Sequence, residues 1–317
     1  MDDRESAYQF HQQAAEAASN GNWPVAAALW TRALELCPED PAFLANRALA
    51  LLEAGRLEES IQDYTFYIEK QPDSVKAYQN RGIGLARSDR FKEAIEDFNQ
   101  ALALDPENLT ILAQRAQAFS LDHEVTLALG DYSALLSHEP DNPHFLMQRG
   151  YCLFLLARNN DAVADYSRLI DVQPDNFLAF NRRGAALELL GRVEEARRDY
   201  DTSIQLNQSY ADAFVNRGKL MASLGKGEAA LADFGHAIQL DPGNPIAYHN
   251  RGVTLMEAGR YLEALDDFTA SLELQPDFMW AVRKRAEVFS LLGRHQEEQQ
   301  DRFKADQLAN DWKQVER

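Results

Sequence analysis

The sequence predicts an all-α solenoid built from about nine helix–turn–helix units of 34 residues each. Three observations predict this fold. Prolines recur at a spacing of 34 residues, small and aromatic residues recur in phase with them, and the apolar spacing within each unit fits two helices. Self-similarity at a fixed period of roughly 20 to 50 residues is typical of repeat architectures. Each unit of such an array packs only on its neighbours.

Seven of the eleven prolines define the repeat, with Gln208 in one slot of the same lattice. They are Pro38, Pro72, Pro106, Pro140, Pro174, Pro242 and Pro276. With this proline as the thirty-second residue, the repeats begin at Ala7, Pro41, Val75, Leu109, Pro143, Phe177, Ala211, Pro245 and Met279. Pro41, Pro143 and Pro245 follow Asp or Asn, which suits a helix N-cap followed by proline at the first helical position.

Three further positions carry side chains of one kind in almost every repeat. The eighth residue is Gly or Ala in all nine repeats, and the twentieth is Ala or Ser in the first eight. The twenty-fourth residue is aromatic in eight: Trp30, Tyr64, Phe98, Tyr132, Tyr166, Tyr200, Phe234 and Phe268. Small residues let two helices approach closely, and the ring fills the space beside them. With these positions in phase with the proline, the chain resembles the tetratricopeptide repeat (TPR) family from residue 7 to about residue 312.

The resemblance implies a right-handed superhelix of helical hairpins whose first helices line a concave groove. It implies one solenoid domain over residues 1–317, with residues 296–317 as a polar C-terminal capping helix. We expect Phe303 and Trp312 to be partly buried in this cap. A polar end is what a solenoid needs where stacking stops.

Arg at the seventh position and Asp at the twenty-third occur together in eight repeats. The first repeat has neither, since Gln13 and Leu29 stand there. This internal covariation predicts an Arg–Asp pair across the two helices of one repeat, 16 residues apart. A partly buried charge needs a partner, so we interpret the pairs as structural and not as a ligand-binding stripe.

In TPR proteins the second, fifth, sixth, ninth, twelfth and thirteenth residues of a repeat tend to face the ligand. The sixth position is an amide in six repeats, namely Asn46, Asn80, Gln114, Gln148, Asn216 and Asn250. A side-chain amide both donates and accepts, so this column suits a bound peptide backbone; the alternative is that the amides bridge neighbouring helices. An arrangement of this kind is similar to the asparagine ladder of the protein O-glycosyltransferases.

Apolar residues at the other groove positions are expected to provide specificity. Met147, Tyr151 and Phe154 form the main set, with Leu178 in the next repeat. Leu49, Leu52, Ile83 and Ala86 form a second set, and Val253 and Met256 form a third. Exposed Met and aromatic side chains are typical of protein-binding surfaces. The alternative is that some of these side chains pack between helices.

Composition excludes several functional classes. The formal charge of −18 disfavours nucleic acid and anionic membrane as partners. No stretch is apolar enough for a membrane span, and the N-terminus lacks signal-peptide features, so we expect a cytoplasmic protein. The two cysteines form no metal motif, and the histidines and glycines form no catalytic or phosphate-binding motif. We expect no enzyme activity, no catalytic or metal site and no cofactor.

The sequence therefore predicts a non-enzymatic scaffold or adaptor that holds a peptide segment or helix of a partner protein in its groove. The alternative is a regulatory or accessory subunit of an enzyme complex. The carboxylate clamp of chaperone-binding TPR proteins is disfavoured, because only Asn46 and Lys76 match its five positions. Neither the partner nor self-association follows from the sequence.

Overall fold

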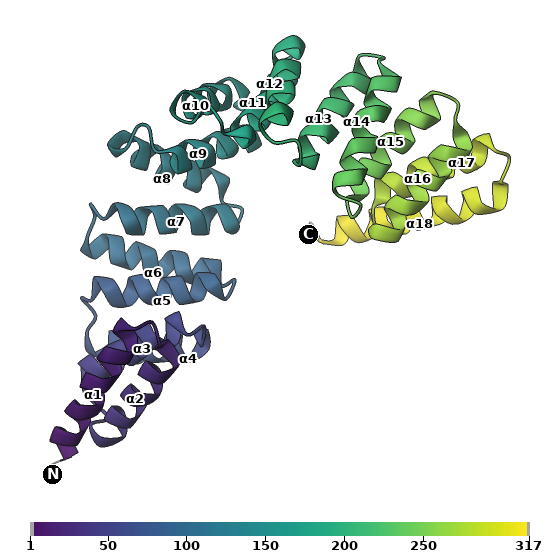
Figure 1. The fold of residues 1–317 in the computed structure, drawn as a ribbon. Helices are drawn as coiled ribbons and strands as arrows, with labels where there is room; N and C mark the ends of the chain where they lie inside the picture. Colours follow the sequence, from purple (N-terminus) through teal and green to yellow (C-terminus); the bar gives the residue numbers. More distant parts are fainter. Residues whose placement is uncertain (1–2, 316–317) are drawn as a thin grey trace. The chain divides into compact units, whose positions relative to one another are not determined.

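The computed structural model describes residues 3–315, and within that range the chain consists of helices joined by short turns. The first helix of each repeat has an odd number and is called its A helix; the second is called its B helix. The first ten are α1 (Asp3–Ser19), α2 (Trp23–Leu36), α3 (Pro41–Glu53), α4 (Leu57–Lys70), α5 (Val75–Arg87), α6 (Phe91–Leu104), α7 (Leu109–Leu121), α8 (Val125–His138), α9 (Pro143–Leu155) and α10 (Asn159–Val172). The rest are α11 (Phe177–Leu189), α12 (Val193–Leu206), α13 (Ala211–Ser223), α14 (Gly227–Leu240), α15 (Pro245–Glu257), α16 (Tyr261–Leu274), α17 (Met279–Leu291) and α18 (His295–Val315). The predicted all-α solenoid fold is confirmed (Figure 1).

The helices begin where local chemistry favours a start. Every A helix from α3 to α17 begins at the residue where the 34-residue period places a repeat start, whereas α1 begins at Asp3, four residues before Ala7. The Asp40 carboxylate accepts from the backbone N–H groups of Ala42 and Phe43, ahead of a proline at the first helical position. Asn142 and Asn244 do the same for α9 and α15. The predicted N-caps are therefore confirmed.

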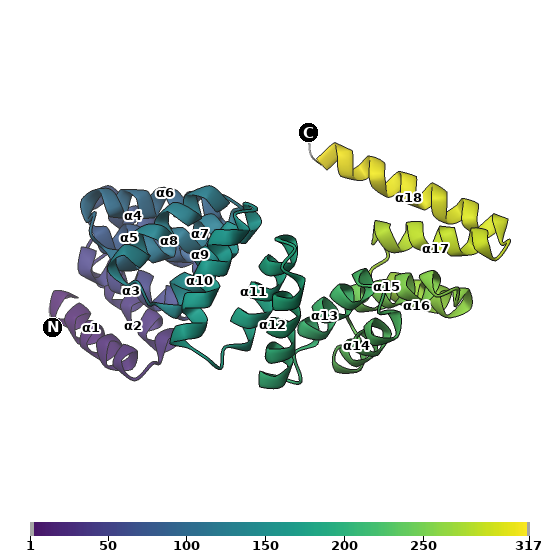
Figure 2. The same cartoon turned by 90° about the horizontal axis from the view of Figure 1, so that it is seen from above.

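The chain divides into two compact units, one ending at Ala157 and the other beginning at Arg158. Unit 1 contains α1–α9 and unit 2 contains α10–α18. Within each unit, consecutive helices pack side by side, as α17 and α18 do in Figures 1 and 2. The single domain predicted over residues 1–317 stays a prediction.

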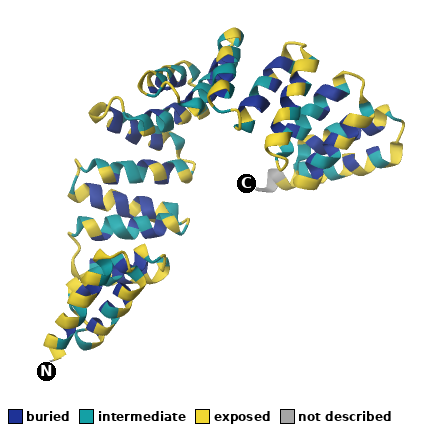
Figure 3. Cartoon of the chain, viewed as in Figure 1, coloured by how far each residue is buried: buried dark blue, intermediate teal, exposed yellow. Residues whose placement is uncertain are grey.

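In the repeats that lie within one unit, the A and B helices pack on each other, and both carry buried residues, drawn dark blue in Figure 3. The eighth-position glycine packs directly on the twenty-fourth-position ring of the same repeat. A Cβ on Gly184 would lie 2.7 Å from Cε1 of Tyr200, and one on Gly82 would lie 2.8 Å from Cε1 of Phe98. The two backbones approach this closely because no side chain separates them.

The end of unit 2 is formed by α18, whose first residue lies one position before the predicted cap. Residues 316–317 lie outside the described part of the chain, as does the side chain of Trp312. The prediction for Phe303 is wrong, because its side chain is 65% exposed. Phe303 occupies the twenty-fifth position, which in earlier repeats faces the following A helix, and in the described chain no helix follows α18. No helix among the described residues is both long and apolar enough to cross a membrane.

The predicted Arg–Asp pairs are confirmed in seven repeats of the described chain. In each, Nε and Nη2 of the arginine donate to the two carboxylate oxygens, as Arg81 does to Asp97 at 2.8 and 2.7 Å. The pairs are Arg47–Asp63, Arg81–Asp97, Arg115–Asp131, Arg183–Asp199, Arg217–Asp233, Arg251–Asp267 and Arg285–Asp301. Arg149 and Asp165 belong to different units, so their pairing stays a prediction.

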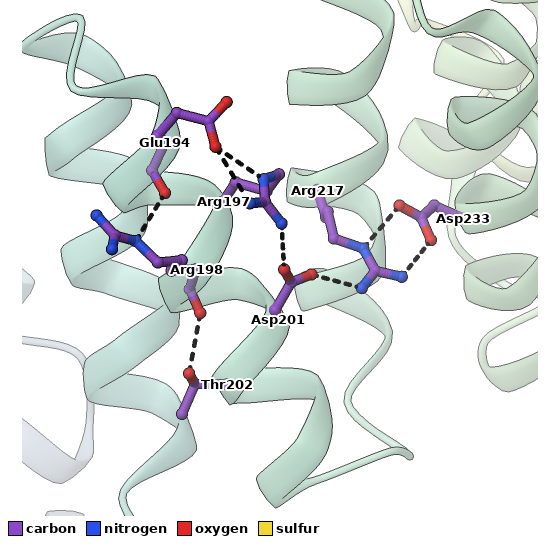
Figure 4. A network of polar contacts seen from close by, with 7 residues as sticks. All are labelled: Glu194, Arg197, Arg198, Asp201, Thr202, Arg217 and Asp233. Atoms are coloured by element: carbon purple, nitrogen blue, oxygen red, sulfur yellow. Dashed lines mark hydrogen bonds and ion pairs between the residues drawn. The ribbon is translucent and has the colours of Figure 1, made fainter.

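The same arginines also join neighbouring repeats, which the sequence pattern did not predict. In five of the seven, Nη1 donates to a side-chain oxygen at the twenty-fifth position of the preceding repeat. The acceptors are Thr65, Asn99, Ser167, Asp201 and Thr269, for Arg81, Arg115, Arg183, Arg217 and Arg285 respectively. Figure 4 shows one of these connections, in which Arg217 on α13 bridges Asp201 on α12 and Asp233 on α14. We call the combined set of bonds the Arg–Asp ladder.

We call each Arg–Asp pair, with any bond that its arginine makes to the preceding repeat, a rung of the ladder. Two of the seven described rungs lack the bond to the preceding repeat. Thr31 donates its hydroxyl to the carbonyl of Ala27, and Arg47 bonds to Asp63 through Nε and Nη2 without reaching Thr31. Before Arg251 the twenty-fifth position is Gly235, which has no side chain to accept. Of these two positions, only Gly235 lacks a side-chain acceptor. The Arg–acceptor bond that joins α13 to α12 therefore has no counterpart between α15 and α14.

The first prediction concerns the cost of breaking one rung. Burial raises the pKa of Asp97, and the bonds from Arg81 act in the opposite direction. We expect Arg81→Leu to lower the free energy of unfolding by about 3 kcal/mol at neutral pH, because it leaves a buried carboxylate without its partner. The loss should shrink on acidification, since a protonated Asp97 no longer needs a cation. Combining Arg81→Leu with Asp97→Leu should recover most of the stability in urea unfolding.

Arg90→Leu is the matched control, because Arg90 pairs with Glu93 at the surface and should cost less than about 1 kcal/mol. A double-mutant cycle for Arg81 and Asp97 with no coupling energy would contradict a structural role for the pair.

The second prediction concerns the missing acceptor. We expect Gly235→Ser to stabilise the chain by about 1 to 2 kcal/mol, because serine favours helix over glycine and its hydroxyl can accept from Arg251. A Cβ on Gly235 meets no atom within 4 Å, so the change is not hindered. Hydrogen exchange should slow in both α14 and α15.

Gly130→Ser is the control, since Gly130 also lies within a helix with open space around it. It should stabilise by about 0.5 kcal/mol and slow exchange in α8 alone. Equal effects of the two substitutions would show that the bond to Arg251 does not form.

Candidate functional site

The candidate site lies on one face of the A helices, formed by the second, fifth, sixth, ninth, twelfth and thirteenth residues of each repeat. We call this surface the A-helix face. It carries all nine predicted site residues. Unit 1 holds Asn46, Asn80, Gln114, Met147, Gln148, Tyr151 and Phe154, and unit 2 holds Asn216 and Asn250. Tyr151 is 39% exposed and the other eight are half-buried, so none belongs to the core.

Three of the six amides are partly used in bonds between helices. Asn80 donates to the hydroxyl of Tyr64 at 2.9 Å, and Gln114 accepts from Gln79 at 3.0 Å. Asn216 donates to Asn181, also at 3.0 Å. The bridging alternative therefore describes these three amides.

The other three amides are Asn46, Gln148 and Asn250. Their side chains make no hydrogen bond to a described residue. Gln114 also keeps its amide N–H groups, because only its oxygen accepts from Gln79. Both donors and acceptors therefore remain available on the A-helix face.

The predicted apolar sets divide between surface and core. The expectation that Leu52 faces a ligand is wrong, because its side chain is buried in the core of unit 1 and packs between helices, as the alternative interpretation had it. Leu49, Ile83, Ala86, Val253 and Met256 are half-buried, whereas Leu178 in unit 2 is exposed. Beside Tyr151 and Phe154 on α9, Leu155 adds an exposed apolar side chain that the sequence analysis did not select.

A hollow of about 330 Å³ opens on the A-helix face between α5 and α7. Its lining consists of Ile83, Ala86, Arg87, Phe98, Gln114, Gln117, Ala118 and Leu121. Sequence reasoning missed Gln117 and Leu121, although both occupy groove positions of the fourth repeat. Leu121 is 48% exposed, which the repeat pattern alone does not reveal.

Unit 2 carries a different pair of exposed side chains on its A-helix face. Ile246 and Trp280 occupy the second position of the eighth and ninth repeats, and Trp280 is 58% exposed. The guanidinium of Arg283 lies over the Trp280 ring, 5.8 Å from its centroid. Neither side chain was predicted from the sequence. Both stand at the second position of their repeats, and this shared position could have identified them.

Cysteine and metal-binding side chains are two of the groups that a reactive site can use. Burial raises the pKa of the Cys152 thiol, which keeps it protonated and unreactive at neutral pH. No group of three His, Cys, Asp or Glu side chains in the described part of the chain is arranged to hold a metal ion.

His249, at the fifth position of the eighth repeat, carries a buried polar atom on this face. Its ring packs between Phe268 and Phe278, and its buried Nδ1 has no hydrogen-bond partner among the described residues. Burial, aided by the charge of Lys284, lowers the pKa of His249 to about 4. The imidazole is therefore neutral at physiological pH.

Stacked helical hairpins with a small-residue and aromatic core define a helical repeat protein. Sequence profiles described as tetratricopeptide repeat match residues 11–75, 156–211 and 190–245, and two more profiles with that description match 75–108 and 245–278. These matches cover more than half of the chain. The chain belongs to the tetratricopeptide repeat family.

One curated protein is similar to a short part of this chain in sequence, and three solved structures are similar in fold at low identity. The TPR repeat-containing thioredoxin TTL4 of Arabidopsis thaliana is 42% identical over 57 residues, which is 18% of this chain and 8% of that protein. The C-terminal part of a TPR protein from Cytophaga hutchinsonii superposes with a TM-score of 0.64 at 16% identity, over 76% of this chain and 98% of that one. A TPR protein from Parabacteroides merdae gives 0.56 at 17% identity, over 79% and 99%. A chain of the APC/C hetero-tetramer Cut9–Hcn1 gives 0.57 at 15% identity, over 84% and 52%.

The third prediction concerns the pH dependence that His249 produces. Because its pKa is lower in the folded state, the unfolded chain binds the proton first, and stability falls as the pH drops from about 6.5 towards about 4. We expect His249→Met to make the chain about 2 kcal/mol more stable, relative to wild type, near pH 5 than near pH 7.5. His236→Met is the control, because His236 is exposed. A stability difference independent of pH would exclude a buried neutral imidazole.

Proposed function

We propose that this chain is a non-enzymatic scaffold or adaptor that binds a peptide segment or helix of a partner protein on its A-helix face. The observation that carries the proposal is the character of this face on α5, α7 and α9. Apolar side chains there are left partly exposed beside amides with free hydrogen-bonding groups, around a hollow of about 330 Å³. Membership of a family of repeat proteins that generally act as scaffolds supports the same role.

The proposed partner is a protein or peptide and neither nucleic acid nor membrane. The net charge of −18 repels phosphates and anionic lipid. The proposed location is the cytoplasm, which suits two free cysteines, Cys37 half-buried and Cys152 buried. Self-association is left out of the proposal.

The second candidate is a regulatory or accessory subunit of an enzyme complex. It is supported by the structural likeness to a chain solved as part of the Cut9–Hcn1 hetero-tetramer. Both functions use the same face, and they differ in whether the captured partner is an enzyme whose activity changes on binding.

The fourth prediction tests the face. We expect the double variant Tyr151→Ala and Phe154→Ala to lose capture of partner proteins in affinity purification from native lysate, because exposed rings contribute most of the contact energy at such surfaces. Its free energy of unfolding should stay within about 1 kcal/mol of wild type, as for other surface substitutions.

The matched control is Leu104→Ala with Leu127→Ala, two exposed apolar residues on B helices of the same unit. It should retain every partner. If the Tyr151 and Phe154 variant keeps its partners, or unfolds several kcal/mol more easily, the two rings are not a binding surface.

A further inference from the structure

We propose that the hollow between α5 and α7 receives one aliphatic side chain of an extended partner segment, and that basic residues flank this side chain in the partner. This inference rests on the proposed function and names the chemistry of the bound segment. We call the hollow the anchor pocket. It lies wholly within unit 1.

The walls of the anchor pocket are apolar. Ile83 and Ala86 from α5 and Leu121 from α7 form its partly exposed sides, and the buried ring of Phe98 on α6 lies beneath them. Because Gly82 lets this ring approach α5 closely, the wall recedes instead of being filled by a side chain. An apolar cavity that is open to water gains stability when an aliphatic group displaces that water.

Amides stand at the same opening. Gln117 is exposed, and Gln114 keeps its N–H groups because its oxygen already accepts from Gln79. A peptide that places a side chain in the pocket brings its own backbone within reach of these groups. The amides hold the backbone, and the apolar walls select the side chain.

Negative charge surrounds the opening. The pocket lies at the C-terminal ends of α5 and α7, where the carbonyl groups carry partial negative charge. Asp89, Asp122 and Glu124 follow in the adjoining turns, and none makes an ion pair with a described residue.

Cations near the opening are outnumbered. Over residues 87–124 the sequence has eight Asp and Glu against four Lys and Arg, namely Arg87, Arg90, Lys92 and Arg115. Arg87 lines the pocket and keeps its charge, because it donates to the neutral carbonyl of Leu52, whereas Arg90 pairs with Glu93 and Glu58 and Arg115 with Asp131. The potential at the pocket therefore favours a partner that carries Lys or Arg.

A second copy of this chain is a poor occupant, because two chains of charge −18 repel each other. An acidic segment is excluded by the same carboxylates. A segment with Leu, Ile or Met beside basic residues matches both the apolar walls of the pocket and the negative charge at its opening.

The test is selection from a displayed library of random peptides of about nine residues, long enough to cross two repeats when extended. The full chain is the bait. We expect enrichment of Leu, Ile or Met at one position, with Lys or Arg within two residues of it. Selected peptides are then synthesised, and their affinity is measured by fluorescence anisotropy.

One variant fills the pocket, a second makes its wall polar and a third removes charge at its rim. Ala86→Leu and Leu121→Gln should each weaken the selected peptides about tenfold, and Leu121→Gln serves if the bulkier Ala86→Leu does not fold. Asp122→Asn with Glu124→Gln should weaken them about threefold at low salt and hardly at all at high salt. Ala222→Leu, the same position in unit 2, is the matched control and should leave affinity unchanged.

Failure of this inference is distinguishable from failure of the proposed function. Peptides that are enriched without the aliphatic and basic signature, or that bind the pocket variants as tightly as wild type, would overturn the assignment of the pocket and leave the scaffold function standing. If no peptide is enriched, and the Tyr151 and Phe154 variant also keeps its partners, both proposals fail.

Discussion

In five of the seven described Arg–Asp pairs, one guanidinium performs two tasks. Nε and Nη2 fix the A helix to the B helix of its own repeat, and Nη1 fixes it to the B helix before it. A planar group with donors in fixed directions can satisfy both partners at once, which a lysine cannot. Where these bonds form, they link one repeat to the next and add directional contacts to the packing that spaces the side chains along the A-helix face. The ion pairs are partly buried, so they contribute specificity of packing more than net stability.

The sequence predicted the helices and the pairs within repeats because their determinants are identical side chains at a fixed period. Asp or Asn before proline marks helix starts, and Arg with Asp recurs at one separation. The bond to the preceding repeat was missed because its acceptors are Thr, Asn, Ser and Asp, which share an oxygen and not a residue type. The exposure of Phe303 and the burial of Leu52 were missed for a related reason. A repeat pattern describes the average position, whereas burial depends on the particular neighbour.

In the candidate site, too, the positions could be predicted from the sequence but their surroundings could not. All nine predicted residues lie on the A-helix face, yet the pattern did not distinguish amides that bridge helices from amides that stay free. Asn80 is used by a tyrosine of the repeat before it, whereas Asn46 is not. Leu121 and Gln117 stood at groove positions without attracting notice, because only the depth of the space between α5 and α7 distinguishes them. The volume of the hollow depends on several side chains together, and no single position of the repeat predicts it.

The direction of the Nη1 bond has a consequence for how such a chain can be lengthened or shortened. A 34-residue segment cut at the start of an A helix carries an arginine whose acceptor stays behind in the preceding segment. Removal of residues 211–244 would bring Asp201 before Arg251 in place of Gly235, and the shortened chain would regain an acceptor that the longer one lacks. Duplication of the same residues would place Gly235 before Arg217 and add a second gap. The interchangeable module of this protein is therefore a B helix with the A helix that follows it, one helix out of step with the repeat that the prolines mark.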